Sequence, residues 1–596
     1  MTGAVYRFVG RIFRSLWVAG PIFDKELRVS SRRRRNYVLR FVYLGLLVIF
    51  LSLVWLGFVH SGSSGLYTAS RMAEAGKFII AYIIWFQFCA AQVVAVIMLS
   101  TSISDEIYNR TLGTLMTTPI NSFQIVMGKL FSKLLQLILL LAISLPLLAM
   151  VRVFGGVPWG YVISSLCITL TTILFVGSLS LFFSIFNKRA YTAIITTFVL
   201  IVVLFALAPY LAAFGCKAIT GHWPNQKMTG IIFCPNPYFA MFVKTISMLE
   251  PRSVGNLPSS LWYLHCVIVL GASAIVLFVS VIFVRKVALR QATGQTIVSS
   301  GRRSSKKIAA QLQSTGRTKI ARIRRVKGPP VAWKELCAPL VGKHKLLTYL
   351  TVFFAFVLLV VSYGLFAGEG MLDDRETHII YAVIFLGLGL LLSVVVPATS
   401  ISSEKEARSW PLLLSTTLSN WQIILGKFLG VLRRCLLGWV LLLGHIVFFS
   451  ITGFIHPVGL LQITILIISV SIFLACSGLY FSSLFKRTTS AVIMNLLLAA
   501  SLWIILPLFA NIAAQISRFG RDTAGTYADA NPFIQAVCIM DATAHGGSLS
   551  KYDWIGLKSG DSALATVWIL LCMLAYSFVG FCFLWRAKCR IRRGIF

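Results

Sequence analysis

The residues of this chain that could perform chemistry do not group into a catalytic motif. Eight histidines and 18 acidic residues are spread along the sequence. The sequence has no H-E-x-x-H zinc motif, no G-x-S-x-G nucleophile motif and no C-x-x-C pair among its 12 cysteines. We therefore expect no catalytic, cofactor-binding or metal-binding residues, and we predict that the chain is not an enzyme.

Two Gly-Lys pairs invite comparison with a phosphate-binding loop. That loop reads G-x-x-x-x-G-K-[ST], and its hydroxyl residue contacts Mg²⁺. Gly128-Lys129 and Gly426-Lys427 both lack the upstream glycine and the following hydroxyl residue. We interpret the two lysines instead as snorkelling side chains at the cytoplasmic end of a membrane span. ATP hydrolysis, if it drives this protein, must therefore come from another chain.

Histidines and arginines in or near apolar stretches are the next candidates. An ionisable group buried in a membrane is a functional candidate by default. Isolated neutral histidines, however, are often hydrogen-bonded core residues, and we interpret His265 and His445 in that way. We expect Arg433 and Arg434 to reach the lipid headgroups.

Long apolar stretches must position all of these residues. The chain is 58% hydrophobic and only 12% charged, whereas soluble domains carry about 25% charged residues. Stretches of about 20 residues rich in Leu, Ile, Val and Phe recur, which favours membrane helices over the ten-residue strands of a barrel. We predict an all-α integral membrane protein with about 12 transmembrane helices.

The expected spans fall into two groups of six. They lie near residues 37–58, 78–102, 130–153, 160–186, 190–213 and 262–284, and near 346–367, 378–402, 435–455, 458–485, 490–514 and 564–586. Because six is even, both groups enter the membrane from the same side, as a parallel repeat. The expected domains are a first six-helix half over 1–284, a basic cytoplasmic linker over 285–328 and a second half over 329–596.

A duplicated segment supports the repeat. Residues 401–427 align with residues 103–129 without a gap at an offset of 298, with ten identical residues, where average composition would give about two or three. Three further pairs match at or near this offset: Lys188-Arg189 with Lys486-Arg487, Pro209 with Pro507, and Asn236-Pro237 with Asn531-Pro532.

The charge distribution predicts the orientation. A net charge of +37 would suggest nucleic acid for a soluble protein. In a membrane protein, basic residues gather on the cytoplasmic side, where they set the topology and meet anionic lipid. Residues 285–345 hold 16 Lys and Arg against one acid, whereas residues 515–563 hold four basic and five acidic residues. We therefore expect cytoplasmic termini and no nucleic-acid partner.

The duplicated segment interrupts the apolar pattern on the predicted cytoplasmic side. Tyr108, Leu112, Leu115 and Met116 fall at helical spacing, which predicts a short helix near the membrane interface. In the second copy, Pro411 falls inside the corresponding helix, so that helix should begin or kink at a different place.

The same segment contains a signal for the start of the third span. Asn121 and Gln124 form an N-x-x-Q capping pattern, and Ser419 and Gln422 repeat it in the second copy. Each polar interruption is therefore expected to end where a new helix begins.

These motifs resemble those of the permease subunits of type-II ATP-binding-cassette exporters. The pattern is K-E-L before the first span, then I-S-x-E, L-x-x-T, Q-I and G-K between the second and third spans. The resemblance implies interfacial connecting helices that include Lys25-Glu26 and Lys334-Glu335, and coupling helices over 104–118 and 402–416. The residues that it implies for coupling to the ATPase are Glu106, Arg110, Leu115, Thr118, Glu404, Arg408, Leu413 and Thr416.

The resemblance also implies a function. It suggests a permease in a bacterial inner membrane that exports a substrate by alternating access. Two separate cytoplasmic ATPase subunits would bind ATP and press against the coupling helices. Re-entrant helices are implied in the outer loops 214–261 and 515–563. Cys216 and Cys234 share the first of these loops, and we interpret them as free thiols, with a disulfide as the alternative.

Two other functions fit the same topology. An ion-coupled carrier or channel predicts charged residues at mid-membrane depth, and the sequence offers few. A membrane enzyme acting on lipid would need clustered acids or histidines that face one leaflet, which the sequence does not suggest.

Overall fold

The computed structural model describes most of the chain. The described residues are 20–32, 68–108, 111–112, 120–153, 156–187, 190–250, 261–292, 328–337, 345–544 and 548–592, with scattered residues between 37 and 52. Gaps within these ranges fall at 223, 369, 371, 508, 511–513, 515–520 and 558–559. All statements about the structure below refer to the described residues.

The first set of helices contains nine α-helices and one π-helical turn. They are α2 (Gly20–Ser31), α4 (Thr68–Tyr108), α6 (Ser122–Val153), α7 (Trp159–Phe186), α8 (Ala190–Val202), η2 (Val203–Leu207), α9 (Ala208–Thr220), α10 (Gln226–Phe233), α11 (Pro237–Leu249) and α12 (Leu261–Ala292). The sixth span of this set thus continues, as α12, eight residues beyond the expected domain boundary at residue 284.

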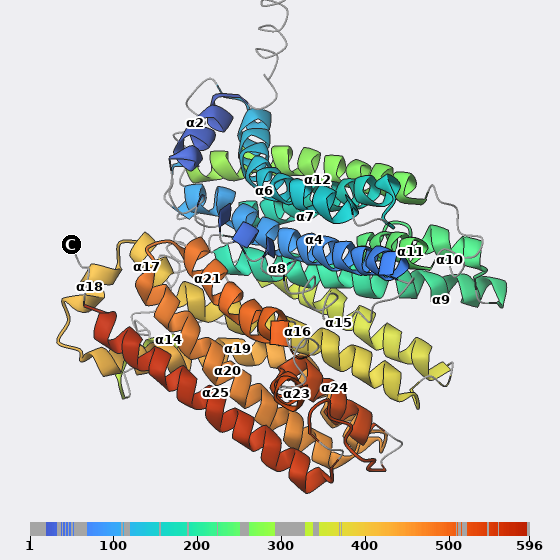
Figure 1. The fold of residues 1–596 in the computed structure, drawn as a ribbon. Helices are drawn as coiled ribbons and strands as arrows, with labels where there is room; N and C mark the ends of the chain where they lie inside the picture. The colour runs from blue at the N-terminus through green and yellow to red at the C-terminus, as the bar shows by residue number, and fades with distance from the viewer. Residues whose placement is uncertain are drawn as a thin grey trace, which may run out of the picture.

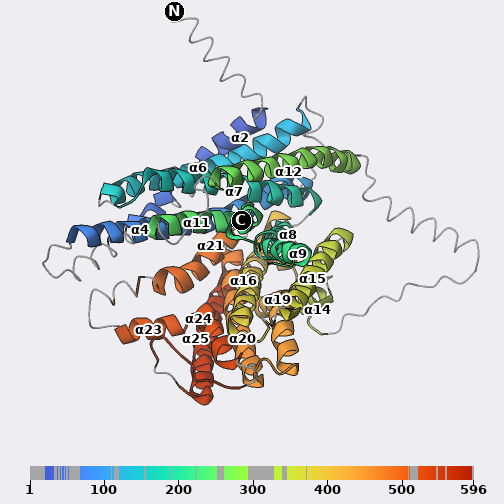
Figure 2. The same ribbon diagram turned by 90° about the vertical axis from the view of Figure 1, so that its right-hand side faces the viewer.

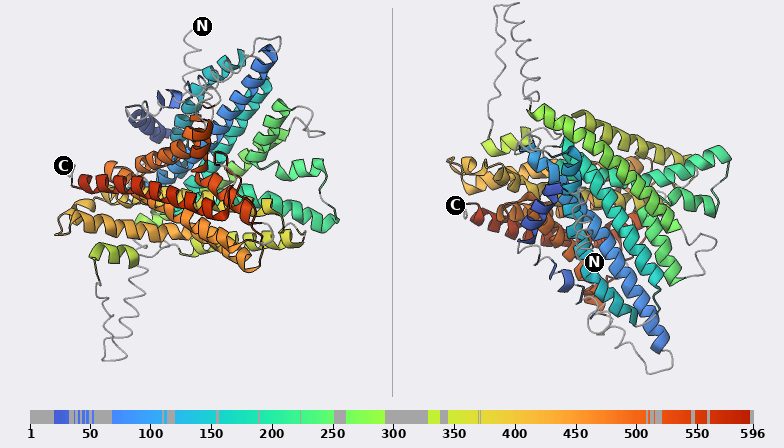
Figure 3. Two further views of the ribbon diagram at one scale, coloured as in Figure 1. Left: turned by 60° about the horizontal axis from the view of Figure 1, so that its bottom comes forward. Right: turned by 90° about the horizontal axis from the view of Figure 1, so that it is seen from above.

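The second set follows the same order. It contains α14 (Pro330–Cys337), α15 (Lys345–Gly368), α16 (Arg375–Ser400), α17 (Ser402–Glu406), α18 (Trp410–Leu414), α19 (Asn420–Ile451), α20 (Pro457–Leu484), α21 (Thr488–Ala500), η3 (Ser501–Ile505), α23 (Arg521–Asp529), α24 (Pro532–Thr543) and α25 (Ser562–Arg590). Figures 1 and 2 show the two sets as adjoining bundles of long helices. Within the second set, α25 lies along α20 (Figure 3).

Ten of the described helical segments are long and apolar enough to cross a membrane. Five belong to the first set and five to the second, and each corresponds to an expected span. The expected span 37–58 lies largely outside the described residues, and the expected span 346–367 corresponds to α15, which is apolar over Leu359–Gly368. The prediction of an all-α integral membrane protein is confirmed.

The helix starts follow from local sequence signals. Ser419 and Gln422 form the predicted capping box at the start of α19, with both reciprocal hydrogen bonds present. At the start of α6, the backbone N–H of Asn121 donates to the side chain of Gln124. A proline in the first turn opens α11, α20 and α24, where its missing N–H costs no helical hydrogen bond.

The two sets meet along a seam. At its centre lie the second and fifth spans of each set, α4 and α8 on one side and α16 and α21 on the other. The helix α15 of the second set also packs on α8 and η2. The apolar cluster at the seam includes Ile97, Ile194, Val395 and Val492. Ile97 and Val395 are related by the 298-residue offset, and so are Ile194 and Val492. Matching positions of the two sets therefore pack together.

Different short helices lie at the two ends of the bundle. We use "connector end" for the end at which α2, α14, α17 and α18 lie, and "loop end" for the end at which α10, α11, α23 and α24 lie (Figure 1). Cys216 and Cys234, towards the loop end, are both free thiols, as we interpreted them.

Candidate functional site

The connecting helix α14 of the second set packs directly on α19. Two glycines of α19 allow this close approach. A Cβ added at Gly426 would lie 2.8 Å from the backbone nitrogen of Ala332, and one added at Gly430 would lie 2.5 Å from the Cβ of Glu335. A larger residue at either position would push the helices apart, so the glycine of the Gly-Lys pair serves helix packing rather than phosphate binding.

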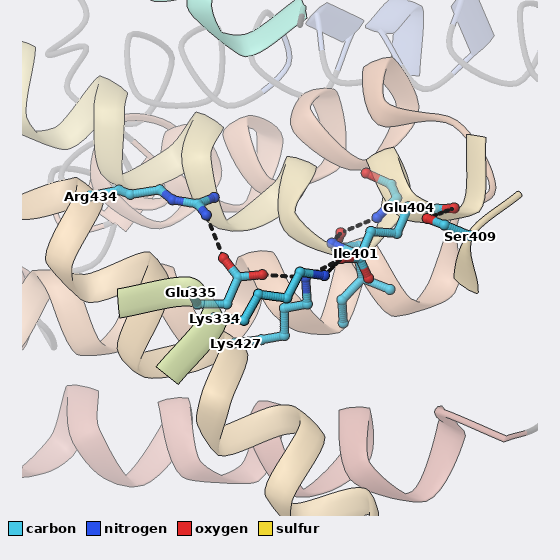
Figure 4. A network of polar contacts seen from close by, with 9 residues as sticks. Lys334, Glu335, Ile401, Glu404, Ser409, Lys427 and Arg434 are labelled. Carbon is cyan, nitrogen blue, oxygen red and sulfur yellow. Dashed lines mark hydrogen bonds and ion pairs between the residues drawn. The ribbon is translucent and has the colours of Figure 1, made fainter. Parts of the chain in front are cut away.

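Lys427 is the centre of a charged cluster between these helices (Figure 4). Its Nζ lies 2.7 Å from Glu335 Oε1 of α14 and 2.6 Å from Glu404 Oε1 of α17. The Lys427 side chain is only 3% exposed. One buried ammonium group therefore joins the connecting helix, the segment after the second span and the third span.

Two further cations complete the second-set cluster. Arg434, about two turns after Lys427 on α19, forms an ion pair with Glu335 Oε2. Lys334 Nζ lies 3.7 Å from Glu404 Oε1, and its side chain is largely exposed. Burial opposes ionisation of Glu335, but Lys427 and Arg434 outweigh it and hold the pKa of that carboxyl below its usual value. Glu335 is therefore ionised at neutral pH.

The first set builds a similar cluster around Lys129. Its Nζ lies 3.0 Å from Glu106 Oε1 and donates to the backbone carbonyl of Ser102 at 2.8 Å. One turn later on α6, Lys133 Nζ lies 3.4 Å from Glu26 Oε2 of α2. The Lys129 ammonium, with a hydrogen bond from Thr111, keeps the pKa of Glu106 low against the opposing effect of burial. Both sets thus tie the connecting helix and the segment after the second span to the third span.

The segment after α16 is held on several sides by consecutive charged residues. Glu404 binds Lys427 on α19. Lys405 Nζ donates to carbonyls at the end of α20, among them that of Ser482 at 3.2 Å. Glu406 Oε1 accepts from the backbone N–H of Thr488, the first residue of α21, at 2.8 Å. A displacement of α17 would therefore reach the third, fourth and fifth spans of this set.

The comparison with known protein families bears on the first set of helices. Residues 21–286 match the family model described as ABC-2 family transporter protein. Over these residues the chain belongs to the ABC-2 transporter family. The protein is thus an ABC-transporter permease that crosses the membrane several times. No curated protein matches the chain.

The permease's two central lysines correct one of our interpretations. We expected Lys129 and Lys427 to snorkel to the membrane surface, but they are 5% and 3% exposed and bind carboxylates. The expectation that Arg434 reaches the headgroups was also wrong, because it pairs with Glu335. In each case an acid on another helix supplies the solvation that the bilayer surface would otherwise provide.

The two histidines behave as hydrogen-bonded core residues, as we interpreted them. His265 Nδ1 lies 2.8 Å from the carbonyl of Cys234. His445 Nδ1 lies 2.6 Å from the hydroxyl of Tyr363, and its Nε2 lies 3.4 Å from Nδ1 of His378. His378 was not singled out from the sequence.

The coupling residues that the resemblance implied have different environments in the permease. Arg110, Leu115 and Thr118 lie outside the described residues. Glu106 and Glu404 point into the clusters rather than outwards. In the second set, Arg408 and Thr416 are exposed and Leu413 is half-buried. In the connecting helices, Lys25 and Lys334 are exposed, Glu26 is partly buried and Glu335 is buried.

The two coupling segments of the permease also differ in shape. Residues 104–108 of the first copy are the end of the long helix α4 rather than part of a separate helix. In the second copy the chain breaks at Arg408, which has a φ of 53°, and restarts as α18 with Pro411 in its first turn. Pro411 thus lies in the first turn of α18, where proline is tolerated, rather than in a helix interior. Most of the corresponding residues of the first copy, 109–119, lie outside the described residues, so the expected difference in helix start stays a prediction.

Several permease residues in the clusters were missed in the sequence. Lys405, Glu406 and Lys133 carry ion pairs or hydrogen bonds between elements. Arg434 was considered, but its pairing with Glu335 was not expected. A signal existed for the two central lysines, since the Gly-Lys pair and the acid 23 residues before it recur at the same offset. No comparable signal marks Lys133 and Arg434, which do not align at that offset.

A substitution at Gly430 tests the contact between α14 and α19 in the permease. We expect Gly430→Ala to lower the free energy of unfolding by about 1–3 kcal/mol, because the added methyl group overlaps Glu335. Thermal unfolding of the purified protein in detergent measures the effect. Gly444→Ala on the same helix is the matched control, since no atom lies within 4 Å of an added Cβ there. Equal stability of the two variants would show that α14 does not pack on α19.

Proposed function

We propose that the chain is a permease for ATP-driven export, with two six-helix halves fused in one polypeptide. A separate ATPase subunit would bind the connector end of each half and supply the ATP-binding site. This proposal puts the connector end and both termini in the cytoplasm of a bacterium, with the helices in the inner membrane. The match of residues 21–286 to the ABC-2 family supports it, as does the second Lys-centred cluster at the same offset.

One observation carries the proposal. The α17 segment is bound through three successive side chains to α19, α20 and α21, while the adjoining α18 presents Leu412 with 72% of its surface exposed. An ATPase that pushes on α18 would therefore move α21, which forms part of the seam. Coupling thus requires contact with the partner at α18 and rigidity at α17.

The direct test is photo-crosslinking at Leu412. A photoreactive amino acid at this position, in the full chain in its native membrane, should crosslink to a subunit that contains a phosphate-binding loop. Leu564 on α25, which is 60% exposed, is the matched control position. Failure of Leu412 to crosslink to any ATPase, or equal crosslinking from both positions, would falsify the proposal.

A further inference from the structure

The fifth span of each set is interrupted by one π-helical turn. The turn η2 joins α8 to α9, and η3 follows α21. In both turns a backbone N–H bonds five residues back, from Ala208 to Val203 and from Leu506 to Ser501. These residues are related by the same 298-residue offset. π-Helical turns are rare and frequently occur at functional sites.

A proline accounts for the interruption in each set. Pro209 has no backbone N–H, so it cannot donate to the carbonyl four residues earlier, that of Phe205. The side chain of Asn236 donates to this carbonyl instead, with 2.7 Å between Nδ2 and the oxygen. In the second set Pro507 leaves the carbonyl of Trp503 without its helical donor, and Asn531 Nδ2 donates to it at 2.6 Å.

The side-chain oxygen of each asparagine binds the start of a second helix. Asn236 Oδ1 accepts from the backbone N–H of Tyr238 at the start of α11, at 2.9 Å. Asn531 Oδ1 accepts from the N–H of Phe533 at the start of α24, at 3.0 Å. Each asparagine thus joins the start of a loop-end helix to the break in the fifth span. The two asparagines are 9% and 8% exposed, so these hydrogen bonds are shielded from water.

The break in the fifth span of the first set lies at the seam. Phe205 of η2 belongs to the apolar cluster at which the two sets meet. Beyond η2, α9 continues the fifth span towards the loop end (Figure 1). A change in the bend at the π turn would therefore move α9 relative to the seam.

We propose that Asn236 and Asn531 are positioning residues that hold the fifth spans bent, and that opening of the seam at the loop end proceeds by a change at these two π turns. The break makes each fifth span a hinge, and the asparagine sets its resting angle. The hydrogen bonds themselves are independent of any ATPase. The opening step rests on the proposed function, because it needs a driving force.

The hydrogen bonds are tested by amide hydrogen exchange on the full chain in lipid nanodiscs. Asn236→Leu leaves the Phe205 carbonyl buried without a donor, and we expect exchange over residues 203–212 to rise by about tenfold. Asn236→Asp retains the acceptor for α11 but removes the donor, so it should raise exchange at the same residues. Asn225→Leu is the matched control, because this exposed helix-capping asparagine makes no side-chain capping bond.

A second substitution makes the test specific. Pro209→Ala restores an N–H that can bond to the Phe205 carbonyl, so the double variant P209A/N236L should regain protection over residues 203–212. If N236L exchanges like the unmodified protein, or if P209A fails to restore protection, the assignment of the hydrogen bond is overturned.

The positioning role needs a measurement that a purely structural role would not change. In complex with the ATPase captured at Leu412, we expect ATP with vanadate to change exchange over residues 203–212 by about tenfold in the unmodified protein. We expect no change in P209A/N236L, because its fifth span should be an uninterrupted helix. An equal nucleotide response in both proteins would show that the asparagine is only structural, and no response in either would overturn the hinge.

The two proposals can fail separately. A crosslinked ATPase with no nucleotide response at residues 203–212 rejects the hinge and leaves the proposed function standing. If Leu412 captures no ATPase, the proposed function and its opening step fail together, while exchange without nucleotide still decides whether the asparagines hold the π turns.

Discussion

Replacing Lys427 with methionine will lower the free energy of unfolding by about 3–5 kcal/mol. Methionine matches the length of the lysine stem but removes the ammonium group. The Glu335 and Glu404 carboxylates, 2.7 Å and 2.6 Å from Lys427 Nζ, would then lose their shared cation. Glu335 keeps Arg434, but among the described residues Glu404 would keep only the exposed Lys334 at 3.7 Å. The loss comes from the Glu404 carboxylate, which is 19% exposed and would have too little positive charge beside it.

The matched control for this change is Lys334→Met. Lys334 also contacts Glu404, but its side chain is 66% exposed, and exposed ion pairs contribute at most about 1 kcal/mol. Chemical unfolding of both variants in the same detergent gives the comparison. If Lys427→Met is as stable as Lys334→Met, then Lys427 does not bridge buried carboxylates.

Replacing Asp529 with asparagine will loosen the loop end of the second set. Asp529 is fully buried, and its carboxylate accepts three backbone N–H groups, from Ile555 at 2.9 Å, Gly556 at 2.8 Å and Leu557 at 2.9 Å. The side chain of asparagine has one acceptor oxygen and one NH₂ group. At least one of the three backbone N–H groups would therefore face the NH₂ group, which is itself a donor. Loss of charge-assisted hydrogen bonds should cost about 2–4 kcal/mol.

The expected effect of Asp529→Asn is local. Limited proteolysis should cut within residues 548–557 much faster in this variant, while the connector end remains protected. Asp553→Asn is the matched control, since Asp553 is exposed. Cleavage at the same rate in both variants would contradict a role for the Asp529 carboxylate in holding this loop.

The two sets of helices are related but not identical at the connector end. The positions of Lys405 and Glu406, which bind α20 and α21, correspond to Ile107 and Tyr108 at the 298-residue offset. Only the second set can therefore make these two contacts with charged side chains. Under the proposed function, the two ATPase subunits would act on permease halves of different internal stiffness.

The sequence alone determined the fold class, the helix starts and the existence of paired motifs. These depend on local signals: runs of apolar residues long enough for a bilayer, the capping residues Ser419 and Gln422, and proline at the start of α18. Such signals act within one or two helical turns, so they can be recognised without knowing which helices are neighbours. The repeated Gly-Lys and Asn-Pro pairs could be found in the same way, but not what they bind.

Only the tertiary structure decided the role of those pairs. Lys427 lies 92 residues from Glu335 in the sequence, and it is buried because α14 packs against Gly426 and Gly430. Asn236 lies 31 residues from Phe205, and its amide has a partner because Pro209 leaves that carbonyl without a donor. Whether a polar side chain in a membrane reaches for water or for another helix depends on which atoms come within about 3 Å of it. The packing of distant segments sets those distances, and a local pattern does not encode them.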